Sequence, residues 1–299
     1  MNRPYVVSAD IYLLLQKWSA RTGFTLPPAE FFAELRVEMS DKLSEIFGPV
    51  ELVGERKLQQ GFTEFFLSNS LPIVSLDRIY VGAEHNLELT RAVDENGNDL
   101  GLRNRAGTPS LARQLRSLQD KLSGGTARRK IALVDDVIFS GDLLLKVVDM
   151  LESINFEVAS VYAGIGIADG VDKVKARNIP IACVCQYDEV IDEVCERDFY
   201  PGVPLSGRLI AGIENTCLPY ILPFGKPGKW ASIPEDQQLD FSLFCWQQTS
   251  RLFAAIEQYS RREVFCHDLG RLVAHLPTNG VRYVEAIKTV DALADVKVA

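Results

Sequence analysis

The chain has 299 residues, 47% hydrophobic and 24% charged, which is the composition of an ordinary soluble globular protein with one large or two modest domains. Its formal net charge of -8 argues against a protein whose whole surface attracts the phosphates of a nucleic acid. No apolar run approaches the roughly 20 residues that cross a bilayer, and the first 18 residues lack the apolar core and cleavage site of a signal peptide. We therefore expect no nucleic-acid or membrane partner and a cytoplasmic location.

The first 70 residues are predicted to form a mainly helical N-terminal extension. Residues 10–23 are rich in apolar side chains and end at a glycine. Residues 27–48 begin with two prolines and repeat apolar residues every three or four positions, as an amphipathic helix does: Phe32, Leu35, Met39, Leu43 and Phe47.

A basic region with hairpin character follows a short strand that begins at Ile73. Residues 87–107 have two extended arms around an ENGND turn, and Ser110 is a plausible cap for a short amphipathic helix. Between Arg91 and Lys130 the chain has nine basic and four acidic residues, so this region is positive within a negative chain.

The clearest pattern is an alternation of buried strands and helices. Residues 130–137, 156–168 and 179–187 are predicted strands, and the segments between them are predicted helices. Continuous apolar strands joined by helices indicate a parallel sheet covered on both faces, which is an α/β fold. We predict three regions: the N-terminal extension 1–70, an α/β core over 71–218, and a mainly helical C-terminal region over 219–299.

Two adjacent acidic residues, Asp135 and Asp136, stand where the first of these strands ends. Ser140 and Gly141 then turn the chain into a helix. In an open parallel sheet, ligands bind outside the carboxyl ends of strands, and a helix amino terminus favours an anion such as phosphate. Carboxylates accept hydrogen bonds from sugar hydroxyls or share a divalent cation. The segment therefore predicts a site for a ribose 5-phosphate group.

The segment IALVDDVIFSGD, within Ile131 to Leu145, resembles the phosphoribosyl diphosphate motif of type I phosphoribosyltransferases. The order of strands and helices after it also resembles that family, over about residues 70 to 215. The resemblance implies a phosphoribosyltransferase-like sheet, phosphoribosyl diphosphate or a nucleoside monophosphate as ligand, and Mg²⁺ on the diphosphate. By this resemblance Asp135 and Asp136 form the catalytic pair that holds the ribose hydroxyls, no side chain is assigned as a metal ligand, and the 5-phosphate lies in the loop of Val137, Ile138, Phe139, Ser140, Gly141, Asp142 and Leu143.

Two further substrate-binding pairs are predicted on either side of the motif. Arg103 and Arg105 lie two apart on one arm of the basic hairpin, so they share a face and suit a diphosphate leaving group. Asp198 and Phe199 follow the third strand, where family members carry a hood whose aromatic residue stacks on the acceptor base. The alternatives are a solvated basic surface and an ordinary surface loop.

The sequence also departs from the family pattern. Phe139 stands where an acidic base is found in purine-salvage members, Leu143 stands where a second phosphate-binding hydroxyl is usual, and Asp142 adds a negative charge. No glycine-rich diphosphate loop is evident, and VGAEHN, residues 81–86, is the nearest segment. These departures motivate a second hypothesis, a ligand-sensing or regulatory protein that keeps the fold without transferase activity.

Other interpretations remain open. The acidic pair could cap the following helix and bind nothing, the segment could belong to a receiver domain, or the chain could serve as a structural member of a complex. Six cysteines, all in the second half, lack the usual spacing of zinc ligands and are expected to be reduced thiols. The sequence does not name the acceptor base or settle the oligomeric state, for which a homodimer is one option.

Overall fold

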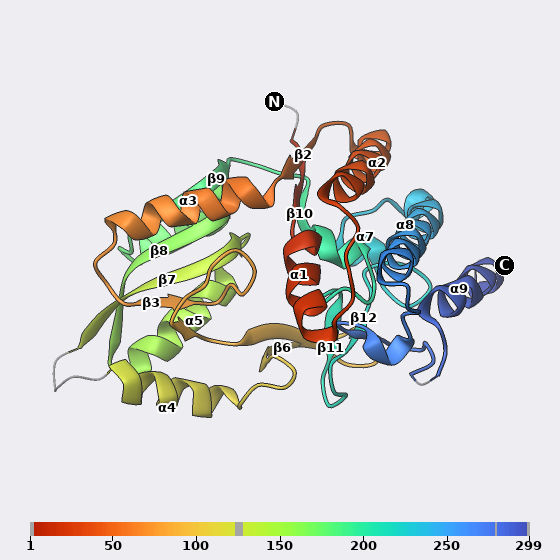
Figure 1. Cartoon of the computed structure of the whole chain (residues 1–299). Helices are drawn as coiled ribbons and strands as arrows, with labels where there is room; N and C mark the ends of the chain where they lie inside the picture. The colour runs from red at the N-terminus through yellow and green to blue at the C-terminus, as the bar shows by residue number, and fades with distance from the viewer. Residues whose placement is uncertain (1–2, 123–127, 279, 298–299) are drawn as a thin grey trace. The chain divides into compact units, whose positions relative to one another are not determined.

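The computed structural model describes residues 3–122, 128–278 and 280–297. These residues form two compact units (Figure 1). Unit 1 contains the described residues of Met1–Val53, Arg91–Gly101 and Ile191–Ala299, and unit 2 contains those of Gly54–Thr90 and Leu102–Val190. Within the described ranges, no helix is both long and apolar enough to span a membrane.

Unit 2 is built on a five-stranded parallel sheet. The strands, in the order β4-β3-β7-β8-β9, are β4 (His85–Asn86), β3 (Ile73–Ser75), β7 (Arg129–Ile138), β8 (Phe156–Ile167) and β9 (Ile181–Tyr187). The middle strand is β7, in which Leu133 pairs with Val74 on one side and Val161 on the other. Ile131, Ala132, Leu133 and Val134 are fully buried, so the apolar run of the sequence forms the centre of this unit.

Helices cover both faces of this sheet. Figure 1 shows α3 (Glu55–Ser68) on one face and α5 (Asp142–Ser153) on the other. The helices α4 (Leu111–Leu122) and α6 (Ala168–Ala176) complete the unit. Leu118, Val147 and Val174 bring apolar side chains from α4, α5 and α6 into one buried cluster with the strands. The predicted α/β fold, a parallel sheet flanked by helices, is confirmed.

Unit 1 contains a second, three-stranded parallel sheet of β1 (Tyr5–Ser8), β2 (Val50–Val53) and β10 (Asp192–Cys195), with β1 in the middle. Its helices are α1 (Ile11–Thr22), α2 (Ala29–Phe47), α7 (Pro227–Trp230), α8 (Gln238–Ser260) and α9 (Tyr283–Lys297). A further sheet has the order β13-β12-β11-β5-β6, with β13 (Leu272–Val273), β12 (Thr216–Leu218), β11 (Arg208–Ile210), β5 (Leu89–Val93) and β6 (Asp99–Asn104). The chain passes between the units within β5 and again within β6.

The structure divides the chain differently from the three predicted regions. The first 70 residues contain the predicted helices but also the strands β1 and β2. The helix α3, which lies within these residues, belongs to unit 2. Residues 191–218, predicted to be part of the α/β core, belong to unit 1, as do residues 91–101. Since β1 pairs with a strand almost 190 residues later in the chain (Tyr5 with Asp192), local sequence patterns could not reveal this sheet.

Candidate functional site

The predicted acidic pair lies at the carboxyl end of β7. Asp135 is 8% exposed and Asp136 is half-buried. Asp135 accepts a hydrogen bond from the backbone N–H of Asp136 (3.0 Å), and Asp136 accepts one from that of Val137 (3.0 Å). Burial, followed by the charge of Asp136, raises the pKa of Asp135 well above its usual value. Burial therefore disfavours the charged form of Asp135.

A third carboxylate at this edge of the sheet was not identified from the sequence. Asp77 follows β3, is 1% exposed, and accepts hydrogen bonds from three backbone N–H groups, those of Ile79 (2.7 Å), Tyr80 (2.9 Å) and Val81 (2.8 Å). Burial, followed by the charge of Asp136, raises the pKa of Asp77 to about 6, against the lowering effect of those N–H groups. The available signal was an acidic residue directly after an apolar strand, the same signal that marked Asp135.

The acidic residues do not form a ready-made metal cage. Among the described residues, no three His, Cys, Asp or Glu side chains are arranged to hold a metal ion. The oxygens of Asp77 are occupied by backbone N–H groups, and the raised pKa of Asp135 disfavours its charged form. Carboxylate oxygen is still the right donor type for Mg²⁺, which is commonly held by one or two carboxylates together with substrate phosphates. The residues therefore fit a cation that arrives with a phosphorylated ligand.

The loop after β7 is shorter than predicted. Val137 and Ile138 belong to β7 and pair with Ile165 and Gly166 of β8, while Asp142 begins α5. The connecting loop is therefore residues 139–141. The side chain of Leu143, predicted beside the phosphate, packs against the hydrophobic core of unit 2.

The geometry of the loop depends on a close approach of two glycines. Gly141 has a φ of +75°, and a Cβ atom placed on it would lie 2.9 Å from the carbonyl oxygen of Gly170 in α6. A Cβ atom on Gly170 would lie 2.4 Å from the carbonyl oxygen of Phe139. Neither position can take a side chain without movement of the loop, so the path of residues 139–141 is fixed by backbone packing on α6.

The loop's own polar groups are partly occupied. Ser140 Oγ donates a hydrogen bond to the carboxylate of Asp142 (3.1 Å), and Lys173 of α6 forms an ion pair with the same carboxylate (3.2 Å). The hydrogen bond from Lys173 is the largest contribution that lowers the pKa of Asp142. Phe139 is 44% exposed beside them. An anion at this helix terminus would have to displace Asp142 from Ser140.

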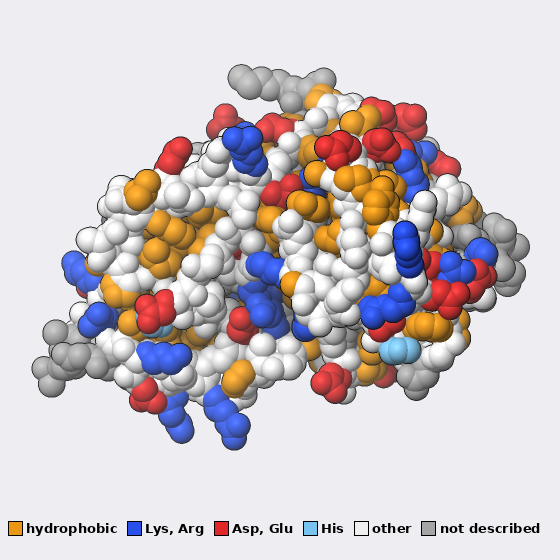
Figure 2. All heavy atoms as spheres, in the orientation of Figure 1, with side chains coloured by type: hydrophobic (Ala, Val, Ile, Leu, Met, Phe, Trp, Pro, Cys, Tyr) orange, Lys and Arg blue, Asp and Glu red, His pale blue; other side chains and the backbone are white. Residues whose placement is uncertain are grey.

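Of the two predicted arginines, the structure brings one to the end of β3. Arg105 donates a hydrogen bond to the carbonyl of Leu76 (3.3 Å), the residue before Asp77, and its Nε lies 3.6 Å from the carboxylate of Glu88. Arg78 contacts the same carboxylate (3.1 Å). Arg103 is exposed and donates to the carbonyl of its neighbour Leu102. Figure 2 shows further Lys and Arg side chains that project from the region of α4.

Asp198 and Phe199 belong to unit 1. Asp198 is 7% exposed, accepts a hydrogen bond from the N–H of Gly207 (2.8 Å), and has its pKa raised by burial. Phe199 is 0% exposed, and its ring packs edge-on against Phe241 with ring centres 5.1 Å apart. A ring packed in this way has no free face for a base, so we do not carry Phe199 into the proposed site.

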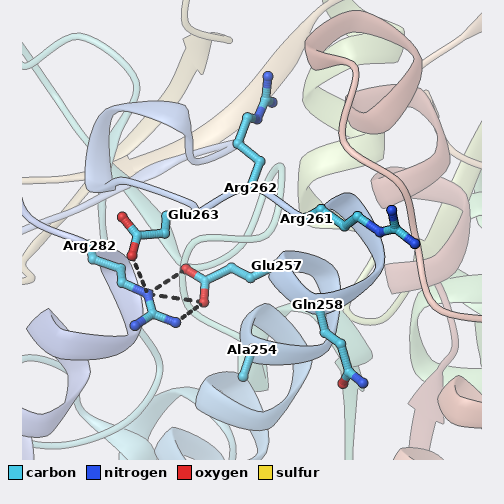
Figure 3. A pocket seen from close by; sticks show the side chains of 7 residues that line it. All are labelled: Ala254, Glu257, Gln258, Arg261, Arg262, Glu263 and Arg282. Carbon is cyan, nitrogen blue, oxygen red and sulfur yellow. Dashed lines mark hydrogen bonds and ion pairs between the residues drawn. The ribbon is translucent and has the colours of Figure 1, made fainter.

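A pocket of about 340 Å³ in unit 1 contains three arginines, but they do not converge. Arg282 donates to Glu257 through Nε (3.0 Å), and the same nitrogen lies 3.9 Å from the carboxylate of Glu263. Figure 3 shows that Arg261 and Arg262 point away from Arg282. Arg282 is therefore already neutralised by the protein, and the other two arginines do not add to it.

No family model matches the chain, and no curated protein matches its sequence. Among solved structures, the chain is similar to the orotate phosphoribosyltransferase of Mycobacterium tuberculosis in complex with 5-phospho-α-D-ribosyl 1-diphosphate (11% identity, 43% of this chain, 70% of that chain, TM-score 0.26). It is also similar to the adenine phosphoribosyltransferase of Thermoanaerobacter pseudethanolicus (12% identity, 44% of this chain, 80% of that chain, TM-score 0.28). A third similar structure is the UMP synthase of Leishmania donovani (9% identity, 44% of this chain, 27% of that chain, TM-score 0.26). TM-scores at this level establish neither a family nor an activity.

Proposed function

We propose that this chain binds phosphoribosyl diphosphate at the carboxyl end of β7 and transfers its phosphoribosyl group to a nitrogenous base or related small molecule. The observation that supports this most is the placement of Asp135 and Asp136 near the carboxyl end of the middle strand of a parallel sheet, two residues before a three-residue loop that leads to the amino terminus of α5. Ligands bind at this edge of open parallel sheets.

In this proposal the acidic pair recognises the ribose. Asp135 and Asp136 each form a hydrogen bond with one of the two ribose hydroxyls. The 5-phosphate takes the place of the Asp142 carboxylate at Ser140 Oγ and at the first N–H groups of α5. The close packing of Gly141 on α6 holds the loop in place while this exchange occurs.

The transfer itself breaks the bond between the anomeric carbon and the diphosphate oxygen, which leaves with the electron pair, and forms a carbon–nitrogen bond to the base. The protein's contribution is to position the reactants and to stabilise the leaving charge. Arg105 and Arg78 are the candidate cations, since they already converge on the carboxylate of Glu88. Mg²⁺, bound with the diphosphate, supplies further positive charge to the leaving group.

A second function is favoured by a specific observation. The hydroxyl of Ser140 is already bonded within the protein, and the side chain of Leu143 lies against the core, so the loop offers fewer free donors than a phosphate site usually has. A ligand-sensing protein that binds a phosphoribosyl compound without turnover would need only part of the site.

A turnover assay distinguishes the transferase from the ligand-sensing protein. We expect diphosphate release when the protein is incubated with phosphoribosyl diphosphate, Mg²⁺ and a panel of purine, pyrimidine and pyridine bases, and we expect Asp135→Asn/Asp136→Asn to abolish it. Asp149→Asn, on the exposed surface of α5, is the matched control and should leave turnover unchanged. Tight binding with no release from any base would reject the transferase in favour of the sensor.

A further inference from the structure

A second cavity lies at the opposite, amino-terminal edge of the sheet of unit 2. Its volume is about 870 Å³, within the range of small-molecule sites. The first residues of three strands line it, Ile73 of β3, His85 of β4 and Arg129 of β7, together with Lys121 near the end of α4. Because β7 runs from this edge to the edge that carries Asp135, the cavity is separate from the proposed phosphoribosyl site.

His85, which lines this cavity, has a buried nitrogen that no described residue pairs with. His85 is 9% exposed, and its Nδ1 is buried without a hydrogen-bond partner among the described residues. The other ring nitrogen, Nε2, lies 3.9 Å from the carboxylate of Glu84, which is too far for a hydrogen bond. Buried polar atoms in folded proteins are nearly always paired, so this nitrogen calls for a partner that the described residues do not supply.

Two cations in the same wall are also without partners in the described part of the chain. Four basic residues lie around the start of β7, and the two outside the cavity are paired: Arg128 with Glu152 (3.5 Å) and Lys130 with Glu157 (3.4 Å). The two that line the cavity, Lys121 and Arg129, make no side-chain ion pair or hydrogen bond with any described residue. The cavity therefore carries positive charge that the protein does not neutralise, apart from the largely exposed Glu84.

Apolar side chains form another part of the wall. Phe66 at the end of α3, Leu71 and Pro72 before β3, and Leu122 of α4 line the cavity beside the basic residues. A wall of this kind suits a ligand with an apolar body and a negatively charged group. A free inorganic ion would leave the apolar part of the cavity unused.

We propose that this cavity binds a small organic anion, with its phosphate or carboxylate between Lys121 and Arg129, a hydrogen bond to His85, and its apolar part against Phe66 and Leu71. The inference does not depend on the proposed transferase, because it uses none of the residues at the carboxyl edge of the sheet. The site is placed where an occupant could regulate unit 2 without competing for the phosphoribosyl site.

Imidazole nuclear magnetic resonance tests this directly, because the protein has only three histidines. The signals of His85 are assigned with His85→Gln, and the full-length protein is titrated with phenyl phosphate, benzoate and inorganic phosphate. We expect phenyl phosphate, benzoate or both to shift the His85 signals saturably, and inorganic phosphate to bind more weakly. The pattern also distinguishes a phosphate from a carboxylate ligand.

Matched variants locate the ligand. Arg129→Ser and Lys121→Ser should each weaken binding about tenfold, the loss expected for a charge-assisted hydrogen bond, while Lys130→Ser and Asp135→Asn/Asp136→Asn should bind like wild type. The proposal is overturned if neither organic probe shifts His85, if inorganic phosphate binds as tightly as phenyl phosphate, or if Lys130→Ser weakens binding as much as Arg129→Ser.

Discussion

Replacement of Gly170 by alanine is the sharpest structural test of the loop that follows β7. The new Cβ atom would lie 2.4 Å from the carbonyl oxygen of Phe139 and 2.9 Å from the nitrogen of Gly141. Contacts below 3.0 Å do not persist, so the Phe139 carbonyl must move by about 0.6 Å or α6 must shift. Because both atoms belong to the backbone, no side-chain rotation relieves the clash.

The expected change in stability is the difference of two effects. Overpacking of this kind costs about 1–3 kcal/mol, and alanine in place of glycine within a helix returns about 0.5–1 kcal/mol. We expect a net loss of about 1–2 kcal/mol in the free energy of unfolding of unit 2 and a weaker affinity for phosphoribosyl diphosphate. Gly82→Ala, in the same unit with no atom within 4 Å of its Cβ position, is the control and should change stability by less than about 1 kcal/mol.

The assay must measure the stability of unit 2 and not that of unit 1. All three tryptophans, Trp18, Trp230 and Trp246, belong to unit 1, so tryptophan fluorescence follows the other unit. Urea-dependent amide hydrogen exchange of peptides from β7 and β8, read by mass spectrometry, follows the sheet of unit 2 directly. If Gly170→Ala were as stable as Gly82→Ala and bound its ligand equally well, the close packing of the loop on α6 would be refuted.

Three further predictions concern individual carboxylates. The pKa of Asp77 is raised from 3.8 to about 6 in the folded chain, so its stabilising contribution is present below about pH 4 and is lost as the pH rises through 6. The free energy of unfolding of wild type, relative to that of Asp77→Asn, should therefore fall by up to about 3 kcal/mol between pH 4 and 7. A difference between the two proteins that does not change with pH would contradict this. Glu196 is 1% exposed and accepts two hydrogen bonds from Arg36 (2.8 and 2.9 Å). Glu196→Gln should therefore destabilise unit 1 by about 3–5 kcal/mol in fluorescence-detected unfolding. A loss below about 1 kcal/mol would contradict the stabilising role of this buried ion pair. Asp142→Asn frees Ser140 from a charged acceptor and should tighten phosphate binding severalfold with little change in stability, whereas weaker binding would show that Asp142 helps to form the site.

The fold of unit 2 could be predicted because its information is local. The apolar run at Ile131–Val134 is a buried central strand, and the alternation that follows it is a parallel sheet with helices on both faces. The sheet of β1, β2 and β10 was missed because its strands have four residues each and pair across most of the chain. Patterns within a window of ten or twenty residues carry no information about such pairing.

The strand–turn–helix segment of the candidate site was predictable from the sequence, and the residues around it were not. Asp135, Asp136 and the turn at Gly141 lie where the sequence placed them, because a strand, a turn and a helix follow one another directly. The role of Asp77 depends on a neighbouring strand, which the sequence does not align with β7. Leu143 was included in the phosphate loop by the family resemblance, whereas its side-chain direction is set by α5, which turns it toward the core.

Calorimetric titration with phosphoribosyl diphosphate, with and without Mg²⁺, tests the central claim most directly. The account predicts saturable binding that Mg²⁺ strengthens, that Asp135→Asn/Asp136→Asn removes, and that Asp149→Asn retains. Absence of binding in wild type, or equal affinity in the double variant, would contradict the phosphoribosyl site and leave the acidic pair as a purely structural feature of β7.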